Sequence, residues 1–417
     1  ASTGSGDWID GFTGGGKIAS LNADLQSNSL KITGLPGVGS VSVNVQNFEN
    51  VEGSDTADRI KGDNRNNILK GNGGNDVMLG SAGNDTYTFG SGSDTIDYTS
   101  LGQAITLNKG GTVSKGSAGK DTFTDFFESI RASSSSNDWI DGSGGTTASI
   151  DANLDSQKLT IKGIPGLGTI TTTVQSFENV RGTNYNDTIA GDSRNNTLIG
   201  DGGNDTISTG GGRDTVDAGS GNDSITVTSA QGGSTSVTTG SGRDTLVFTK
   251  GYWQSLFSGS ASALTITDFT SGAGGDLLDL SQLFRDVSVG FDGSNPFLNG
   301  YLDFVKTGND LQLQFDADGA FDTAFSAKTI ALLKNTKRTD LDKSNFNPAY
   351  DIPPPIIQGT NRSERINGSD EGEWIYAYNG FDTINAQGGD DRLYGGYGND
   401  ILNGGDGNDE LYGEMDD

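Results

Sequence analysis

An acidic motif recurs with a nine-residue period in three separate runs of this chain. In each period an apolar residue follows the acidic position by two residues, and in all periods but the first two of each run a glycine precedes it by two. Gly83, Asp85 and Tyr87 form one such set. A constant period with one acidic and one apolar residue per repeat indicates a solenoid, in which successive repeats stack on one another.

The three runs begin irregularly, and the second one slips. The acidic positions are Asp58, Asn67, Asp76, Asp85 and Asp94; then Asp187, Asn196, Asp205, Asp214 and Asp223; then Glu364, Glu373, Asp382, Asp391, Asp400 and Asp409. After Asp223 the period slips by three residues, and we expect the second run to continue through Asp244 after a bulge or widened turn. Asn67, Asn196, Glu364 and Glu373 depart from aspartate near the start of each run, so we expect no full site there.

Each nonapeptide divides into a turn half and a strand half. The glycine before the acid can take positive φ without a Cβ penalty, so a tight turn is expected at that point. The residues around the apolar position then form a very short strand with one side chain pointing inward. Two nonapeptides complete one coil, which predicts a flat parallel β-helix with a thin core of stacked apolar side chains.

That core is too thin to hold the coils together alone. Burying one apolar side chain in nine residues stabilises less than the ordering of nine backbone units costs, and stacked aspartates repel one another. Calcium, which takes roughly six to eight carboxylate and carbonyl oxygens, would answer both needs and couple metal binding to folding. The predicted metal ligands are Asp58, Asp76, Asp85, Asp94, Asp187, Asp205, Asp214, Asp223, Asp244, Asp382, Asp391, Asp400 and Asp409, with the turn glycines Gly74, Gly83, Gly203, Gly212, Gly389 and Gly398.

The repeat Gly-Gly-x-Gly-x-Asp-x-apolar-x resembles the calcium-binding nonapeptides of RTX proteins. The resemblance covers about a third of the chain and keeps its phase in all three runs. It implies right-handed parallel β-rolls, several Ca²⁺ ions in their turns, and export by a type I secretion system. The fold class predicted from it is all-β, with tandem rolls, intervening β-strand segments and one small β-rich globular domain.

A longer repeat divides the chain into modules. Residues 36–76 align with residues 165–205, and each copy opens with alternating stretches that predict half-buried strands. We predict a first module at 1–131 with its roll at about 53–100, and a second at 132–250 with its roll at about 182–250.

The remainder of the chain is predicted to hold two further units. Residues 251–350 are richer in large apolar side chains, and predict a small β-rich domain with a short helix near 281–285. This domain resembles the target domain of type I secreted proteins. Residues 351–417 hold a stiff proline linker and a third roll that the end of the chain cuts off. Both ends of the chain fall inside repeats, so we expect a segment of a longer polypeptide.

The composition agrees with an extracellular protein whose fold is held together by calcium. The formal net charge is −28, 66 residues are glycine, and only 31% are hydrophobic, so without cations the chain should expand. The acidity argues against nucleic acid and anionic membrane surfaces as partners. No apolar run approaches the ~20 residues of a membrane span, so no membrane insertion is expected.

Catalysis is not expected in these residues. The chain has no histidine and no cysteine, which removes Ser-His-Asp triads, histidine zinc sites and thiol nucleophiles. Paired carboxylates could hydrolyse a glycoside, but the acids mark no cleft. We interpret the chain as part of a secreted bacterial surface protein resembling an S-layer array, with neighbouring copies and cell-surface polysaccharide as partners. The alternatives are the non-catalytic C-terminal half of an RTX protease, lipase or alginate epimerase, and a glycan-binding adhesin module.

Three features outside the period leave alternatives open. Residues 316–319 with Asp322 resemble a shortened calcium loop or an ordinary Asp-Gly turn. Trp8 and Trp139 occupy equivalent positions and either pack over the end of a roll or contact a partner. The tyrosines of the third run either form an aromatic binding face or fill the solvent side of the strands; they are Tyr376, Tyr378, Tyr394, Tyr397 and Tyr412.

Overall fold

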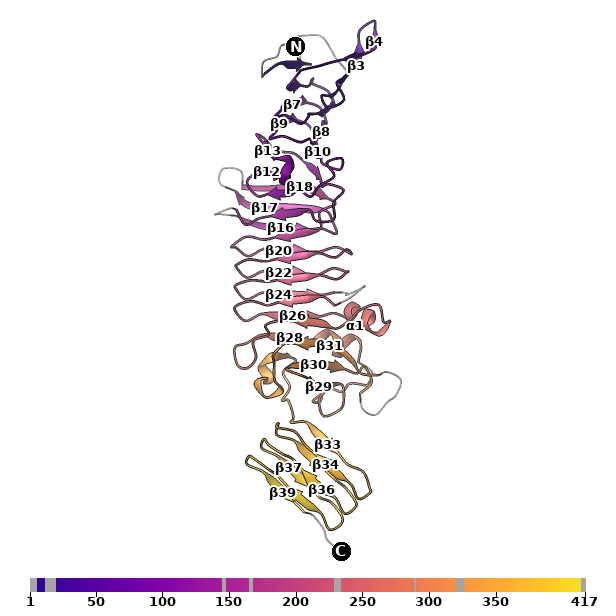
Figure 1. Cartoon of the computed structure of the whole chain (residues 1–417), viewed down its shortest axis with the longest axis vertical. Helices are drawn as coiled ribbons and strands as arrows, with labels where there is room; N and C mark the ends of the chain where they lie inside the picture. Colours follow the sequence, from indigo (N-terminus) through magenta and orange to yellow (C-terminus); the bar gives the residue numbers. More distant parts are fainter. Residues whose placement is uncertain are drawn as a thin grey trace.

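The computed structural model describes residues 6–11, 20–144, 148–164, 168–228, 234–288, 290–319 and 326–413. Coils stack along the longest axis of the molecule, and the third roll forms a separate stack at the C-terminal end (Figure 1). Nearly all regular structure is β, which confirms the predicted fold class.

Two sheets of 16 strands each run through the main body. Sheet A contains, in spatial order, β1 (Trp8–Asp10), β5 (Asn50–Glu52), β7 (Ile68–Gly73), β9 (Thr86–Ser91), β13 (Lys120–Phe123), β12 (Thr112–Ser114), β11 (Thr106–Asn108), β15 (Trp139–Asp141), β19 (Asn179–Arg181), β21 (Thr197–Ile199), β23 (Thr215–Asp217), β25 (Ser236–Thr238), β27 (Leu264–Ile266), β31 (Lys328–Leu333), β30 (Asp310–Phe315) and β29 (Leu302–Thr307).

Sheet B faces it. Sheet B contains β32 (Phe346–Asn347), β28 (Leu277–Asp279), β26 (Thr245–Phe248), β24 (Ser224–Val227), β22 (Thr206–Ser208), β20 (Thr188–Ala190), β16 (Ser149–Asn153), β17 (Lys158–Ile164), β18 (Gly168–Gln175), β14 (Ser129–Arg131), β10 (Thr95–Asp97), β8 (Val77–Leu79), β6 (Arg59–Lys61), β2 (Ser20–Asp24), β3 (Ser29–Leu35) and β4 (Gly39–Asn44).

The register of the rolls follows directly from the sequence period. Ile60 in β6 pairs with Met78 in β8, which pairs with Ile96 in β10, and all three strands are parallel. Neighbouring strands of one sheet are therefore two nonapeptides apart, and the intervening nonapeptide lies in the opposite sheet. This is the coil of a parallel β-roll.

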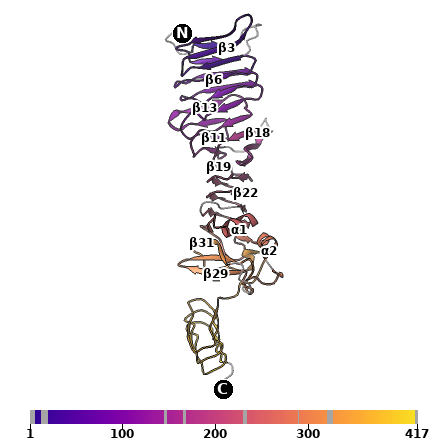
Figure 2. The same cartoon turned by 90° about the vertical axis from the view of Figure 1, so that its right-hand side faces the viewer.

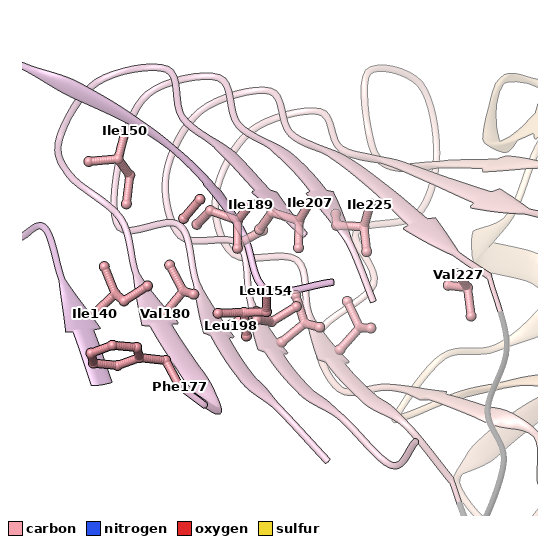
Figure 3. Packing of buried hydrophobic residues seen from close by; sticks show 14 of the residues in the cluster. Ile140, Ile150, Leu154, Phe177, Val180, Ile189, Leu198, Ile207, Ile225 and Val227 are labelled. Carbon is pink, nitrogen blue, oxygen red and sulfur yellow. The ribbon is translucent and has the colours of Figure 1, made fainter. Parts of the chain in front are cut away.

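The apolar residue two places after each acid points inward, as predicted. In the second roll Ile189, Ile207 and Ile225 form one buried row, and Leu198 belongs to the row that faces it (Figure 3). The exposed fraction of each is at most 1%. In the third roll burial weakens toward the end of the described chain, where Leu402 is partly buried and Leu411 is 47% exposed.

Antiparallel segments interrupt the rolls without breaking the sheets. The opening segment of each predicted module forms an antiparallel three-stranded arm, β2–β3–β4 and β16–β17–β18, within sheet B. A further insert, β11–β12–β13, lies in sheet A. Because β14 pairs with both β10 and β18, sheet B continues across the module boundary drawn at 131.

Residues 251–350 continue the same two sheets. β27 pairs with β25, and β28 pairs with β26, both in parallel. The predicted helix near 281–285 is confirmed as α2 (Ser281–Asp286). A second helix that the sequence reasoning missed, α1 (Lys250–Phe257), begins at Thr249, whose side chain accepts from the Tyr252 N–H. Figure 2 shows both helices beside these strands. The described residues also include three short 3₁₀ turns, at Gly116–Ala118, Arg338–Asp340 and Lys343–Asn345.

The third roll has a core of its own. Its strands form two small parallel sheets, β33 (Ile356–Gln358), β35 (Trp374–Tyr376), β37 (Arg392–Tyr394) and β39 (Glu410–Tyr412), and β34 (Arg365–Asn367), β36 (Thr383–Asn385) and β38 (Ile401–Asn403). Ile375, Ile384 and Leu393 belong to a buried cluster separate from that of the main body. The Arg338 guanidinium donates to the Pro353 carbonyl at 3.1 Å and so holds the linker.

Candidate calcium sites in the coil turns

The repeat acids form columns along the rolls, linked by hydrogen bonds to the backbone. Oδ1 of Asp76 accepts the backbone N–H of Asp58 at 2.8 Å, and Oδ1 of Asp94 accepts that of Asp76 at 2.8 Å. Each of these two carboxylates thus accepts the backbone N–H of the residue 18 positions earlier. Because 18 residues make one coil of two nonapeptides, the two nonapeptides of a coil belong to different acid columns. One carboxylate oxygen per repeat joins consecutive coils in this way.

The second carboxylate oxygen is the chemically unusual atom. Among the described residues, eight repeat aspartates bury Oδ2 with no hydrogen-bond partner: Asp76, Asp205, Asp214, Asp223, Asp244, Asp382, Asp391 and Asp400. Burial raises the pKa of Asp76, Asp205, Asp214 and Asp244 to about 7, against the lowering effect of the backbone N–H that Oδ1 accepts. A buried anionic oxygen without a donor is costly. A bound cation or a proton that neutralised this oxygen would therefore stabilise the fold.

At Asp76, Asp205 and Asp400, a glycine five residues before the acid leaves space next to this oxygen. A Cβ on Gly71 would lie 2.2 Å from Oδ2 of Asp76 and 2.6 Å from the Phe89 carbonyl oxygen. A Cβ on Gly200 would lie 2.4 Å from Oδ2 of Asp205. Each glycine thus faces both a carboxylate oxygen and a carbonyl oxygen of the next coil. These are the hard oxygen donors that calcium prefers.

The backbone four residues before the acid distinguishes two kinds of turn. In all eight turns with an unpartnered Oδ2, this residue has positive φ. Four of these residues are glycines, and the others are Asn72 (73°), Asp201 (69°), Tyr378 (74°) and Gln387 (81°). We name these the open turns. Gly90 and Gly405 give Asp94 and Asp409 the same positive φ.

In the closed turns the residue four before the acid is hydrogen bonded to the side chain at the acidic position. The Ser54 N–H donates to Oδ2 of Asp58 at 2.5 Å, and the Thr183 N–H donates to Oδ2 of Asp187 at 2.6 Å. The hydroxyls of both residues donate to the same carboxylates. These oxygens are already satisfied, so the closed turns have less need of a metal than the open turns.

The four departures from aspartate also have closed turns. Asn67 accepts the Asp63 N–H on Oδ1 at 2.8 Å and donates from Nδ2 to the Glu49 carbonyl at 2.7 Å. Asn196 makes the equivalent pair of contacts. Glu364 and Glu373 accept from the residues four before them, Thr360 and Ser369. The asparagine amides of Asn67 and Asn196 thus also donate a hydrogen bond, which a carboxylate cannot do.

The turn glycines two residues before the acid have the expected conformation. Their φ angles lie between +95° and +133° at Gly74, Gly83, Gly203, Gly212, Gly389 and Gly398. A Cβ on Gly83 would lie 2.0 Å from the Arg65 carbonyl oxygen in the preceding coil. These glycines therefore allow the turns of adjacent coils to pack against each other.

The sequence reasoning missed members of the acid columns that lie outside the nine-residue period: Asp121, Asp276 and Glu128, whose carboxylate accepts the Asp94 N–H at 2.6 Å. Asp121 accepts the Asp85 N–H at 3.1 Å, and Asp276 accepts the Asp244 N–H at 3.0 Å. Asp121 and Asp276 keep the local signature of a glycine two before and an apolar residue two after. That signature was the signal available, and Asp121 also has a glycine, Gly116, five residues before it.

The donor set fits calcium held largely by backbone oxygens. Among the described residues, no three Asp, Glu, His or Cys side chains gather into one metal-binding cluster. One carboxylate oxygen and the carbonyls around each open turn are instead available, as expected for glycine-rich turns.

The remaining candidates gain less from the structure. Oδ1 of Asp316 accepts the Asp318 N–H at 3.2 Å, but Asp322 lies outside the described residues. Trp139 lies in β15 between β11 and β19, inside sheet A and away from a free end. Tyr376, Tyr394 and Tyr412 stack face to face with ring centroids 4.6 and 4.8 Å apart, so neighbouring rings cover each other.

Comparison with known proteins agrees with this geometry. A family model described as RTX calcium-binding nonapeptide repeat matches residues 52–87, 61–96, 181–216, 190–225, 367–396 and 388–417. The three runs are RTX repeats, which bind several Ca²⁺ ions, and this confirms the predicted cofactor. RTX proteins are typically extracellular proteins exported by type I secretion.

Similarity beyond the repeats is slight. No curated protein sequence matches the chain. The crystal structure of extracellular lipase LipA from Serratia marcescens matches at 18% identity and a TM-score of 0.20, over 73% of this chain. The match spans only 40% of the lipase chain, and a likeness this low carries no argument about activity. Within the described residues, no helix has the length and apolarity to cross a membrane.

Proposed function

We propose that this chain is part of a secreted structural protein of the bacterial cell surface, in an S-layer-like array, whose rolls become rigid when they bind extracellular calcium. The observation that carries the proposal is the series of open turns. Each holds a buried carboxylate oxygen with no donor, and the series recurs in both bodies of the molecule. Metal-free coils carry this unbalanced charge, and calcium-bound coils do not.

The roles of the chain's own groups follow from their positions. Oδ1 of each acid holds the preceding coil through its N–H, while Oδ2 and nearby carbonyls would hold the ion. At Asp76, Asp205 and Asp400, a glycine five residues before the acid keeps the space beside Oδ2 open. Bound calcium supplies positive charge between coils and so links metal binding to folding. Ligands that bind only the folded state stabilise it by mass action, so the rolls would fold as calcium concentration rises.

A structural role suits the shape and composition of the chain. Two continuous sheets build a long rod (Figure 1), and the acid columns follow the stacked coils, with no cluster of three potential metal-binding side chains among the described residues. The absence of histidine and cysteine from the sequence supports a non-enzymatic role for these residues. Neighbouring copies and cell-surface polysaccharide are the partners we propose, and the net charge of −28 disfavours nucleic acid.

The test has two parts. Circular dichroism of the purified chain during a calcium titration should show β structure forming cooperatively, and excess EGTA should reverse it. Electron microscopy of the native cell envelope, with antibody against this chain, should place it in a regular surface lattice. A spectrum indifferent to chelator would contradict the calcium mechanism, and an irregular, sparse surface distribution would contradict the array.

A further inference from the structure

Lys115 is a charged side chain that the calcium mechanism does not use. It follows β12, its exposed fraction is 0%, and it is the one lysine among the described residues that is buried. Its ammonium donates to the Ser81 carbonyl at 2.7 Å and contacts Oδ2 of Asp85 at 3.4 Å. It also donates to Oδ1 of Asp121. A buried ammonium persists only where such oxygens surround it.

The oxygens around Lys115 are of the kind that the open turns offer to calcium. Asp85 and Asp121 are consecutive members of one acid column, since the Asp85 N–H donates to Asp121. Ser81 lies four residues before Asp85 and contributes a turn carbonyl. The cation therefore lies between two coils, against two carboxylates and a backbone oxygen.

The other oxygens of these carboxylates also accept hydrogen bonds. The Ser81 hydroxyl donates to Oδ2 of Asp85 at 2.9 Å, and the Tyr98 hydroxyl donates to Oδ2 of Asp121 at 2.7 Å. Neither carboxylate has the unpartnered oxygen that marks an open turn. Every oxygen of the two carboxylates therefore already has a hydrogen-bond donor.

The insert that carries Lys115 interrupts the repeat at this coil. Consecutive acids of a column are 18 residues apart before the insert, but Asp85 and Asp121 are 36 apart and Asp94 and Glu128 are 34 apart. The additional residues form β11 and β12, and they bring Lys115 to the column. They also complete an aromatic cluster, in which Phe123 lies 5.7 Å from Phe89 and 4.9 Å from Phe127 between ring centroids.

We propose that the Lys115 ammonium takes the place of a calcium ion between the coils of Asp85 and Asp121. This part of the first roll then closes without metal, and neither aspartate is a calcium ligand. The molecule would contain a metal-independent segment between calcium-dependent coils. The inference rests on the proposed calcium-dependent folding of the rolls.

Hydrogen exchange of the full chain, read by mass spectrometry in calcium and in excess EGTA, tests the proposal. In the unmodified chain, we expect EGTA to reduce amide protection more than about tenfold at residues 203–227, and less than about threefold at 82–90 and 113–124. Loss of protection at 82–90 and 113–124 in step with 203–227 would overturn the proposal without any variant.

A matched pair of variants isolates the ammonium. Lys115→Met removes the buried charge, and Lys120→Met removes an exposed charge five residues away on the same insert. In EGTA we expect Lys115→Met to lower protection at 82–90 and 113–124 by about tenfold or more relative to Lys120→Met. Equal protection in the two variants would also overturn the proposal. Unchanged protection at 203–227 in EGTA would instead contradict the proposed calcium-dependent folding, and the variant comparison would still decide the role of Lys115.

Discussion

Asp205 accepts the backbone N–H of Asp187 on Oδ1 at 2.7 Å, while its Oδ2 is buried without a partner. The two oxygens of one carboxylate thus have different tasks. One joins consecutive coils through the backbone, and the other faces the space that Gly200 leaves open. Asp187 itself lies in a closed turn, where Thr183 satisfies its Oδ2.

Asp205→Asn should change stability in opposite directions with and without calcium. The amide oxygen can still accept the Asp187 N–H, but the buried charge disappears. We expect a higher Tm than the unmodified chain in EGTA, and a Tm lower by roughly 2–4 °C in millimolar calcium. Scanning calorimetry in the two conditions measures both.

Asp187→Asn is the control for this change. An amide has one oxygen where the carboxylate has two. In the closed turn the Thr183 N–H would therefore lose the second carboxylate oxygen as its acceptor and would face the amide nitrogen instead. This variant should lose stability in both conditions, with no change in the calcium midpoint. A variant at Asp205 that behaved in the same way would show that open and closed turns do not differ in metal binding.

The open turns also predict how pH acts on the metal-free fold. Burial raises the pKa of Asp76, Asp205, Asp214 and Asp244 to about 7, from an ordinary value of 3.8. Between these values the folded chain holds protons that the unfolded chain has lost. The free energy of unfolding in EGTA should therefore fall as pH rises from about 4 to about 7, and level off above that.

Calcium binding should release protons over the same range, because the ion requires carboxylates. Isothermal titration calorimetry in buffers of different ionisation enthalpy measures this release. It should be larger at pH 6 than at pH 8. Urea unfolding in EGTA that grew harder from pH 5 to pH 8 would contradict the raised pKa values.

Gly200→Ala tests the space beside the ligand. The added Cβ would lie 2.4 Å from Oδ2 of Asp205 and 2.2 Å from the Ala218 carbonyl oxygen. We expect a loss of about 1–3 kcal/mol in the free energy of unfolding and weaker calcium binding. Gly211→Ala, whose nearest contact would be 3.5 Å away, should change stability by less than about 0.5 kcal/mol. Chemical denaturation with and without calcium compares the two variants.

The repeat period was enough to predict the coils, but it could not predict which turns are open. A period of nine places Ile189, Ile207 and Ile225 in one buried row, because strand register follows sequence spacing. The open backbone depends on left-handed φ at residues such as Tyr378 and Gln387, which do not favour it. Packing between coils determines that conformation. Serine or threonine four before the acid is a local sign of a closed turn, but the closed turns of Asn67 and Asn196 have aspartate at that position.

The nine-residue period also could not predict the contacts made by the insert. Lys115 meets Asp85 30 residues away, and no periodicity relates them. The module boundaries at 131 and 250 follow sequence repeats, whereas the sheets pass through both. Strands at a boundary retain unpaired backbone groups, and pairing with the next segment satisfies these groups.

The third roll should respond to mutation independently of the main body, since its buried cluster is separate. Tyr394 stacks between Tyr376 and Tyr412 on its outer face, with interplanar angles of 4° and 7°. Stacked aromatic pairs contribute about 0.5–1.5 kcal/mol beyond burial. Tyr394→Ala should therefore raise the calcium concentration at which residues 374–403 become protected from hydrogen exchange.

We expect no effect of this change on the main body. The calcium concentration at which residues 203–227 become protected from hydrogen exchange should stay within error of its value in the unmodified chain. Tyr397→Ala provides the matched control, because Tyr397 is 61% exposed and its backbone N–H bond to the Tyr378 carbonyl does not need the side chain. A parallel shift of both midpoints in Tyr394→Ala would mean that the two bodies fold as one cooperative unit. A shift confined to residues 374–403 would mean that calcium closes each stack separately, because the apolar core that couples neighbouring coils is not continuous between them.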